Sequence, residues 1–367
     1  MHQPHPTLAL VALVVIARNE AACIERCLRS AKPFVDRMVV LDTGSTDDTV
    51  ARAKACGADV HEMAWTNDFS AARNAVLDLA NADWNLVMDA DEWLESGGEH
   101  LRTLASASPL LGMVCIQSDT DADDATSRLV SWVPRLLPRG VRYVGRIHEQ
   151  PVSTLPAARQ PIVFGHDGYT ADKMKKKGTR NTQLLLAELQ HRSDDPYLLY
   201  QLGKETELHH EDYPKAADLY ARAFERAPQD APYRQNLALR LLYSLGKSDR
   251  LEDAITHADD CIRTWPAFPD LCFALGLVML DAAVAHPAQA GEQWLPLAEQ
   301  AFTRCLEIGD RADLDGSVIG RGSFLAAHNL ATVYQMQGNV LALKAEHYLA
   351  LSKRLKDEPA TSPQAPV

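Results

Sequence analysis

The sequence predicts an α/β domain with a mostly parallel sheet, followed by an all-helical repeat domain. Up to residue 91, short apolar runs typical of buried strands alternate with segments of helical periodicity. This alternation predicts right-handed β-α units that build a parallel sheet. From residue 195 onward the strand pattern disappears and a helical repeat replaces it. We place the first domain at 1–180 and the repeats at 181–355, and we expect a disordered tail at 356–367.

Composition and charge narrow the class of protein. The 367-residue chain is 46% hydrophobic and 23% charged, as in globular proteins of two domains. Its net charge of −12 argues against nucleic-acid partners and anionic membrane surfaces. Seven scattered cysteines favour a reduced, cytoplasmic protein, with Cys23 and Cys27 as buried hydrophobic residues. The apolar run at 8–17 lacks the flanks of a signal peptide, and no run is long enough to span a bilayer.

Four apolar runs predict the strands of the first half: Leu10–Ile16, Arg37–Leu41, Ala58–Glu62 and Leu86–Met88. Polar residues that can cap the following helices come after three of the first-half runs: Asn19, then Ser45 with Asp48 as a capping box, then Asp68 or Ser70. The third of these helices carries Arg73 and Asn74.

Carboxylates follow two of these strands where each strand ends. Asp42 follows the second, and Asp89 and Asp91 follow the fourth. Ligands of open α/β sheets bind outside the carboxyl ends of the strands. Two aspartates at i, i+2 can reach one divalent cation, and Mg²⁺ or Mn²⁺ commonly holds substrate phosphates. An isolated Asp-x-Asp is weak evidence, because a solvated surface turn has the same pattern.

Four motifs follow one another along the first half: Val15–Glu20, Leu41–Thr49, Trp65 with Asp68–Asn74, and Met88–Glu92. Their joint order and spacing resemble those of family 2 glycosyltransferases of the GT-A fold. The resemblance covers roughly residues 8 to 180 and is much more specific than any single motif. It is strongest to the bacterial branch with appended tetratricopeptide repeats, which includes peptide S-glycosyltransferases of the sublancin type.

The resemblance implies a UDP-sugar donor, UDP-glucose or UDP-N-acetylglucosamine, and a Mn²⁺ or Mg²⁺ cofactor. Asp42 would bind the uracil or ribose, and Arg73 would face the nucleotide. Asp89 would touch the ribose or the metal and its water, with Asp91 as the direct metal ligand. The same resemblance places Ala17, Asn19 and Glu20 at the donor. The metal would act as a Lewis acid on the diphosphate leaving group.

Family 2 enzymes invert the anomeric carbon, which implies a general base for the acceptor. We expect Glu149 to be this base, with Asp167 as the second candidate. The sequence lacks the Glu-Asp and Gln-x-x-Arg-Trp signature of the processive synthases. His166 is either a ligand of the metal or diphosphate, or a structural residue.

The segments around these residues are predicted as strands. Ser131–Leu137 and Val141–Val144 are expected to pair as a hairpin that leads to Glu149, and a short strand, Pro161–Phe164, leads to His166. After them, Lys176 and Arg180 lie at i, i+4 on one helical face. They form either a basic flap over the diphosphate or a solvated helix start.

The second half resembles tetratricopeptide repeats. Small residues and prolines recur at corresponding positions: Ala216, Ala223 and Pro228; Ala254, Cys261 and Pro266; Ala298 and Cys305. Small residues let paired helices approach closely, and stacked repeats offer a concave face. Homodimerisation and the binding of a peptide, protein or saccharide acceptor are equally compatible with such a face.

We therefore expect a metal-dependent, cytoplasmic glycosyltransferase that uses a UDP-sugar. The alternative from another class is a catalytically silent scaffold in which the repeats bind other proteins. A nucleotidyltransferase shares the sheet and the paired aspartates. It requires a glycine-rich loop with a basic residue after the first strand, and Ala17–Glu20 does not match that pattern.

Overall fold

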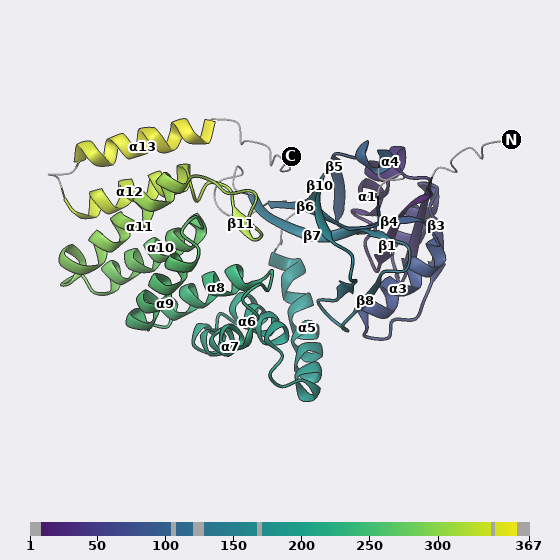
Figure 1. Ribbon diagram of the computed structural model, residues 1–367, viewed down its shortest axis with the longest axis horizontal. Helices are drawn as coiled ribbons and strands as arrows, with labels where there is room; N and C mark the ends of the chain where they lie inside the picture. The colour runs from purple at the N-terminus through teal and green to yellow at the C-terminus, as the bar shows by residue number, and fades with distance from the viewer. Residues whose placement is uncertain (1–8, 104–107, 120–127, 167–170, 339–341, 358–367) are drawn as a thin grey trace. The chain divides into compact units, whose positions relative to one another are not determined.

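The computed structural model describes residues 9–103, 108–119, 128–166, 171–338 and 342–357 (Figure 1). Two compact units divide the chain. The first contains described residues 9–119 and 131–166, and the second contains 128–130 and 171–357. Within these ranges, every helix is too short or too polar to cross a membrane.

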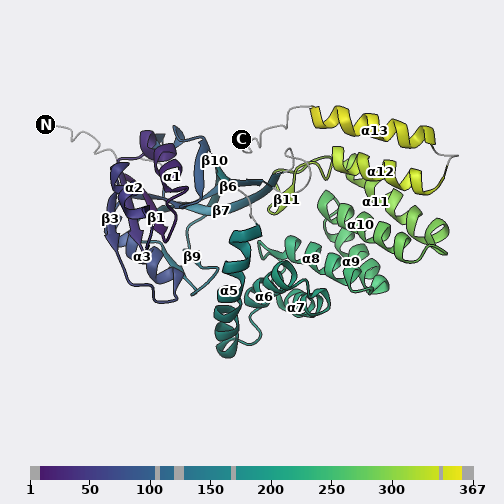
Figure 2. The same cartoon turned by 180° about the vertical axis from the view of Figure 1, so that it is seen from behind.

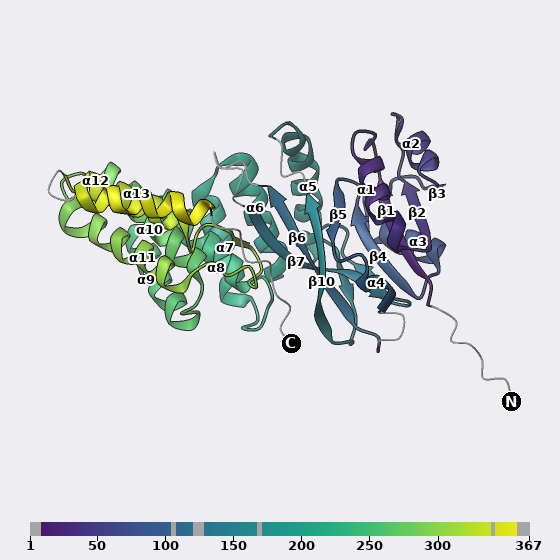
Figure 3. The ribbon, with the colours of Figure 1, turned by 90° about the horizontal axis from the view of Figure 1, so that it is seen from above.

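The first unit is built on a mixed sheet with the strand order β3-β2-β1-β4-β7-β6-β10-β5 (Figure 3). In that order the strands are Asp59–Glu62, Arg37–Asp42, Val11–Ala17, Trp84–Asp89, Arg128–Pro138, Leu111–Asp119, Ala157–His166 and Glu92–Ser96. The first four strands are parallel to one another, as the alternating pattern predicts. β7 is antiparallel to β4, and β5 is antiparallel to β10.

Helices cover both faces of the sheet (Figure 2). α1 (Ile24–Ala31) and α2 (Thr49–Ala55) pack on one face, and α3 (Phe69–Ala80) packs on the other. β1 is buried on both faces because its apolar, β-branched side chains alternate between the two cores. The parallel register pairs Ala17 with Asp42 and Ile16 with Asp89, so both acidic residues end at one edge of the sheet.

Two of the predicted helix caps are wrong. α1 begins only after Cys23, and the Asn19 side chain accepts a hydrogen bond from the Thr46 amide instead. The Ser45 hydroxyl accepts from the Asn19 amide, so it forms no capping box with Asp48. Both side chains connect the two loops that follow β1 and β2, which a pattern local to one helix does not reveal. The Asp68 cap of α3 is confirmed, since its carboxylate accepts from the Ala71 amide at 2.9 Å.

The predicted hairpin is also wrong. β7 pairs with β4, whereas β8 (Arg142–Val144) pairs with β9 (Gln150–Val152) in a separate two-stranded sheet. β8 ends at Val144, where the predicted strand Val141–Val144 also ends. β5, in contrast, was not predicted, because its sequence Glu-Trp-Leu-Glu-Ser is polar at two of the three positions on one face.

The second unit consists of paired helices, as predicted. The helices are α5 (Ala171–His191), α6 (Pro196–His210), α7 (Tyr213–Arg226), α8 (Arg234–Lys247), α9 (Leu251–Thr264), α10 (Pro269–Ala285), α11 (Leu295–Ile308), α12 (Phe324–Met336) and α13 (Ala342–Asp357). The predicted small positions on α7, α9 and α11 are all buried: Ala216, Ala223, Ala254, Cys261, Ala298 and Cys305. Gly203 fits directly against the Tyr220 ring, where a Cβ atom would clash.

Short elements complete the chain: a 3₁₀ helix at Lys32–Phe34, α4 (His100–Thr103), a π-helical turn at Ala290–Trp294 and β11 (Ser317–Val318). β11 pairs with the first residues of β7, Leu129 and Val130, which belong to the second unit. The predicted boundary at residue 180 lies within α5. Residues 356 and 357 of the predicted tail are helical, and 358–367 lie outside the described residues.

Lys204 on α6 is a charged group desolvated inside the repeat unit. Burial lowers the pKa of Lys204 from 10.5 to about 8, and the charge of Arg240 contributes in the same direction. Between these two pKa values, the unfolded chain binds more protons than the folded protein does. The free energy of unfolding contributed by this group therefore rises as pH increases through that window.

Lys204→Met is expected to raise the free energy of unfolding at pH 7 by roughly 1–3 kcal/mol, because it removes a desolvated charge. The gain should shrink between about pH 8 and 10.5, where the wild-type lysine loses its proton in the folded protein. Chemical denaturation at a series of pH values measures both effects. Lys215→Met, at an exposed position of α7, is the matched control. Identical pH profiles for the two variants would contradict the assignment.

Candidate active site

The loops that follow β1 and β2 are joined by side-chain hydrogen bonds. The Asn19 backbone amide donates to the Ser45 hydroxyl at 2.9 Å, and the Thr46 backbone amide donates to the Asn19 side-chain oxygen, Oδ1, at 2.8 Å. The Glu20 amide donates to the Thr49 hydroxyl at 2.7 Å. Asn19 adopts the left-handed backbone conformation that this arrangement needs, with φ of 57°. The predicted donor residues after β1 are therefore fixed to the loop that begins at Asp42.

Asp42 lies at the end of β2 with only 4% of its surface exposed. Its Oδ2 atom accepts hydrogen bonds from the amides of Gly44 and Ser45, at 3.0 and 2.9 Å. Gly44 makes the turn possible with φ of 102°. The Oδ1 atom is buried and has no hydrogen-bond partner in the part of the chain that the structure describes. A buried acceptor without a partner is costly, so this oxygen is suited to a donor group from a ligand.

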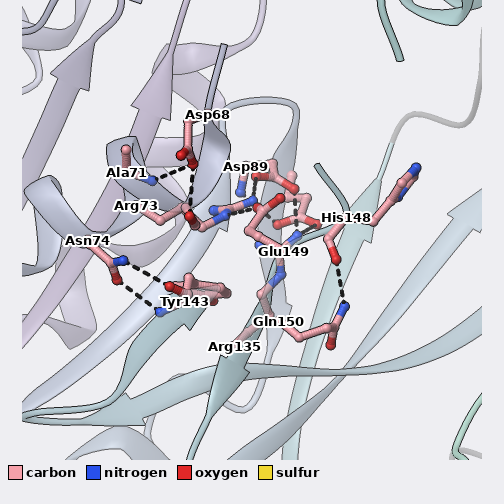
Figure 4. A network of polar contacts seen from close by, with 12 residues as sticks. Asp68, Ala71, Arg73, Asn74, Asp89, Arg135, Tyr143, His148, Glu149 and Gln150 are labelled. Carbon is pink, nitrogen blue, oxygen red and sulfur yellow. Dashed lines mark hydrogen bonds and ion pairs between the residues drawn. The ribbon is translucent and has the colours of Figure 1, made fainter. Parts of the chain in front are cut away.

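Two buried arginines organise the neighbouring carboxylates (Figure 4). Arg73 donates through Nη2 to Asp89 at 2.7 Å and through Nε to Glu149. Arg135 donates to the other Asp89 oxygen at 2.5 Å and to Glu92 at 3.0 Å. The second Glu92 oxygen accepts from the Asp89 backbone amide at 2.8 Å. We call these five residues the arginine–carboxylate network.

The pKa values in this network move in opposite directions. Burial raises the pKa of Asp89, but Arg135 and Arg73 outweigh it and hold that pKa well below its usual range. Burial raises the pKa of Glu92 to about 7, with the negative charge of Asp89 adding to the shift and Arg135 opposing it. Asp89 is therefore ionised throughout the physiological range, whereas Glu92 exchanges its proton near neutral pH.

Asp91 and His166 lie next to each other beyond the network. The Asp91 Oδ2 and His166 Nε2 atoms are 3.7 Å apart, and His166 Nδ1 lies 3.2 Å from the Ser118 hydroxyl. Burial lowers the pKa of His166, but its contact with Asp91 outweighs burial and leaves that pKa raised.

The donor set fits a divalent cation that also binds a substrate. Asp91 and His166 offer one oxygen and one nitrogen close enough to share an ion, as Mn²⁺ accepts. Within the described ranges, no group of three His, Cys, Asp or Glu residues is arranged for a metal. Phosphate oxygens and water would have to complete the shell, which is usual for Mg²⁺ and Mn²⁺ at nucleotides. Asp89 would have to leave one of its arginines to become a ligand.

Glu149 lies in the loop of the β8–β9 hairpin, directly before β9. Its side chain is 9% exposed and is held by Arg73. Asp167, the second predicted base, lies outside the described residues. The Lys176 side chain also lies outside them, although its backbone belongs to α5. Arg180 donates to the Asn181 side chain at 3.4 Å, and its role at a diphosphate stays a prediction.

Arg135 and Glu92 belong to the site but have no role predicted from the sequence. Arg135 follows Trp132, Val133 and Pro134 and precedes two leucines in an apolar run. A charged residue inside such a run must be paired when the strand is buried. That signal was present, but it does not identify the partners, since Asp89 and Glu92 come from other strands.

Residues 12–109 match the family model for glycosyl transferase family 2. A TPR repeat-containing protein of Synechococcus elongatus is 36% identical over 211 residues, which are 53% of this chain and 52% of the relative. The SPbeta prophage-derived glycosyltransferase SunS of Bacillus subtilis is 29% identical over 205 residues, or 53% of this chain and 48% of SunS. The chain thus spans about half the length of these curated relatives.

Two solved structures also show a likeness. MamA from Desulfovibrio magneticus RS-1 is 14% identical, with a TM-score of 0.38 over 52% of this chain and 94% of that chain. Glucosyl-3-phosphoglycerate synthase from Mycobacterium tuberculosis is 25% identical, with a TM-score of 0.26 over 32% of this chain and 50% of that chain. The family match itself establishes a family 2 glycosyltransferase region in the N-terminal half of this chain, as predicted.

Arg135→Met is expected to destabilise the first unit by roughly 3–5 kcal/mol, because it leaves the buried Glu92 without its cation. Arg102→Met is the control, since Arg102 forms an exposed pair with Asp36 whose loss should cost about 1 kcal/mol or less. Denaturant titrations that follow the unfolding of the first unit compare the two. Equal losses would show that the network does not hold the site together.

Proposed function

We propose that this chain is a metal-dependent, inverting glycosyltransferase that uses a UDP-sugar donor. The observation that carries the proposal is the unpartnered Oδ1 atom of buried Asp42, at the same sheet edge as Asp89. A rigid turn already satisfies the other Asp42 oxygen. The free oxygen would accept a hydrogen bond from the uracil N–H or a ribose hydroxyl, and the family match to residues 12–109 supports this assignment.

The Asp91–His166 pair supports a Mn²⁺ or Mg²⁺ ion at the diphosphate. Such an ion supplies Lewis acidity to the diphosphate leaving group. Asp91 and His166 would hold it, and Arg73 and Arg135 would keep Asp89 ionised beside them. In this proposal Asp91 would contact the ion directly, whereas Asp89 would hold the two arginines in place.

In the reaction, an acceptor hydroxyl or thiol attacks the anomeric carbon from the side opposite the diphosphate. The bond from that carbon to the diphosphate oxygen breaks, and UDP leaves with the electron pair. The acceptor proton passes to a carboxylate, for which we keep Glu149 as first candidate and Asp167 as second. Glu149 is supported by its link through Arg73 to Asp89, which places it in the same polar cluster.

A catalytically silent scaffold would have no need to keep the Asp42 Oδ1 atom buried without a hydrogen-bond partner. A retired site should lose buried charges, which are costly to keep. The chain instead buries Arg73, Arg135 and the Glu92 that pairs with Arg135. This observation favours the enzyme over the scaffold.

The acceptor and the cellular setting are further parts of the proposal. The paired helices of the second unit would hold a peptide, protein or saccharide acceptor, or would form a homodimer. A reducing, cytoplasmic setting is supported by the seven cysteines, which are all buried free thiols. The donor sugar would be glucose or N-acetylglucosamine.

Asp42→Asn is expected to weaken the binding of UDP and of the UDP-sugar by a similar factor, about 10- to 100-fold. The remaining oxygen would stay with the Gly44 and Ser45 amides, so an NH₂ donor would replace the unpartnered Oδ1 acceptor. A contact made equally to both ligands is uniform binding, so kcat at saturating donor should hardly change. Calorimetry with UDP and steady-state kinetics measure these quantities. Asp48→Asn, at an exposed position of the same loop, is the control. Unchanged UDP affinity would support the scaffold instead.

Asp91→Asn is expected to abolish the part of UDP binding that depends on Mn²⁺ and to reduce turnover strongly, since an amide oxygen is a weaker ligand than a carboxylate. Calorimetry with and without Mn²⁺ tests this independently of activity. Asp83→Asn, which changes an exposed aspartate, should behave like the wild type. If Asp91→Asn keeps its metal-dependent UDP affinity, Asp91 is not the ligand.

A further inference from the structure

Four residues of helix α3 hold the β8–β9 hairpin. The Phe69 amide donates to the Arg146 carbonyl oxygen at 2.9 Å. Arg73 pairs with Glu149, and Asp78 pairs with Arg142. The fourth residue, Asn74, bonds to the hairpin backbone. Positions 69 and 73 lie about one turn apart, and so do 74 and 78, so the four contacts extend along the helix and around about half of its circumference.

Asn74 binds both backbone polar groups of Tyr143 (Figure 4). Its side-chain nitrogen donates to the Tyr143 carbonyl oxygen at 2.9 Å, and its side-chain oxygen accepts from the Tyr143 amide at 2.9 Å. The carboxamide thus takes the place that a neighbouring strand would occupy at the β8 edge. Tyr143 is buried, and the Arg73 guanidinium lies 5.4 Å from its ring centre.

The segment between Tyr143 and Glu149 depends on this attachment. It contains Gly145 with φ of 98° and His148 with φ of 51°, which are conformations of a tightly turned loop. Asn74 fixes the segment at one end, and Arg73 fixes the carboxylate at the other. Because the two residues are adjacent in α3, the helix sets the distance between the two attachments.

We propose that Asn74 is a positioning residue that holds Glu149 in place for the transfer reaction. The inference rests on the proposed function, and it adds a residue whose side chain bonds the hairpin backbone. Removing the Asn74 carboxamide leaves both Tyr143 backbone groups without their partner and releases the β8 end of the hairpin. A displacement on the order of 1 Å at a reacting group typically costs about 10²-fold in rate.

The Asp78–Arg142 pair provides a matched control. It joins the same helix to the same strand, next to Tyr143, but both side chains are exposed, at 63% and 46%. An exposed ion pair holds its partners weakly. Asp78→Ala is therefore expected to leave transfer within about twofold of the wild type.

A double-mutant cycle distinguishes positioning from general destabilisation. Asn74→Ala should lower kcat by about 10²-fold with unchanged UDP affinity, and Glu149→Gln should lower it by roughly 10²–10⁴-fold. In the Glu149→Gln background, Asn74→Ala should have almost no further effect, because the group it positions has lost its function. Equal factors in both backgrounds would overturn the proposal.

Hydrogen exchange of the hairpin provides a readout that does not need activity. Asn74→Ala should speed exchange of backbone amides in 141–152 while the amides of β1 and β4 stay protected, and Asp78→Ala should not do so. Unchanged hairpin exchange in Asn74→Ala would overturn the positioning role. If the hairpin loosens but the wild type transfers no sugar and binds no UDP, the proposed function fails and the structural role of Asn74 stands.

Discussion

The site depends on the need to neutralise two buried arginines. Arg73 comes from α3 and Arg135 from β7, and both contact Asp89 at the end of β4. Glu149 in the hairpin loop accepts a second hydrogen bond from Arg73, and Glu92 at the start of β5 accepts a second one from Arg135. A buried guanidinium without a carboxylate is strongly unfavourable, so these segments must fold together. The constraint fixes the relative positions of segments that are far apart in the sequence.

The positions of Asp42 and Asp89 could be predicted from the sequence because they follow from local pattern. Apolar runs identified the central parallel strands, and the ends of parallel strands converge at one edge. As expected, Asp42 and Asp89 lie at the carboxyl ends of the two strands that flank β1. The helical repeat was equally accessible, since its small buried residues recur at corresponding positions.

The loop contacts of Asn19 and Ser45, the pairing of β7 and β8, and strand β5 depended on contacts between distant segments. Asn19 and Ser45 both have side chains suited to helix caps, yet they bind each other's loops because β1 and β2 end side by side. The hairpin prediction failed because β7 found its partner in β4, earlier in the chain, while β8 turned back to β9. The glutamates of β5 made its sequence look unlike a buried strand. Glu92 is buried because it pairs with Arg135, which comes from a distant segment. Single-sequence patterns carry no information about such pairings.

Burial raises the pKa of Glu92 to about 7, so the protonation of this residue affects the net charge of the arginine–carboxylate network. With Glu92 protonated, the two guanidinium groups balance the carboxylates of Asp89 and Glu149, and the network is electroneutral. With Glu92 ionised, the same five side chains carry one excess negative charge. Under the proposed function, the departing diphosphate is an anion, and the form of the network in which Glu92 carries a proton would repel it less.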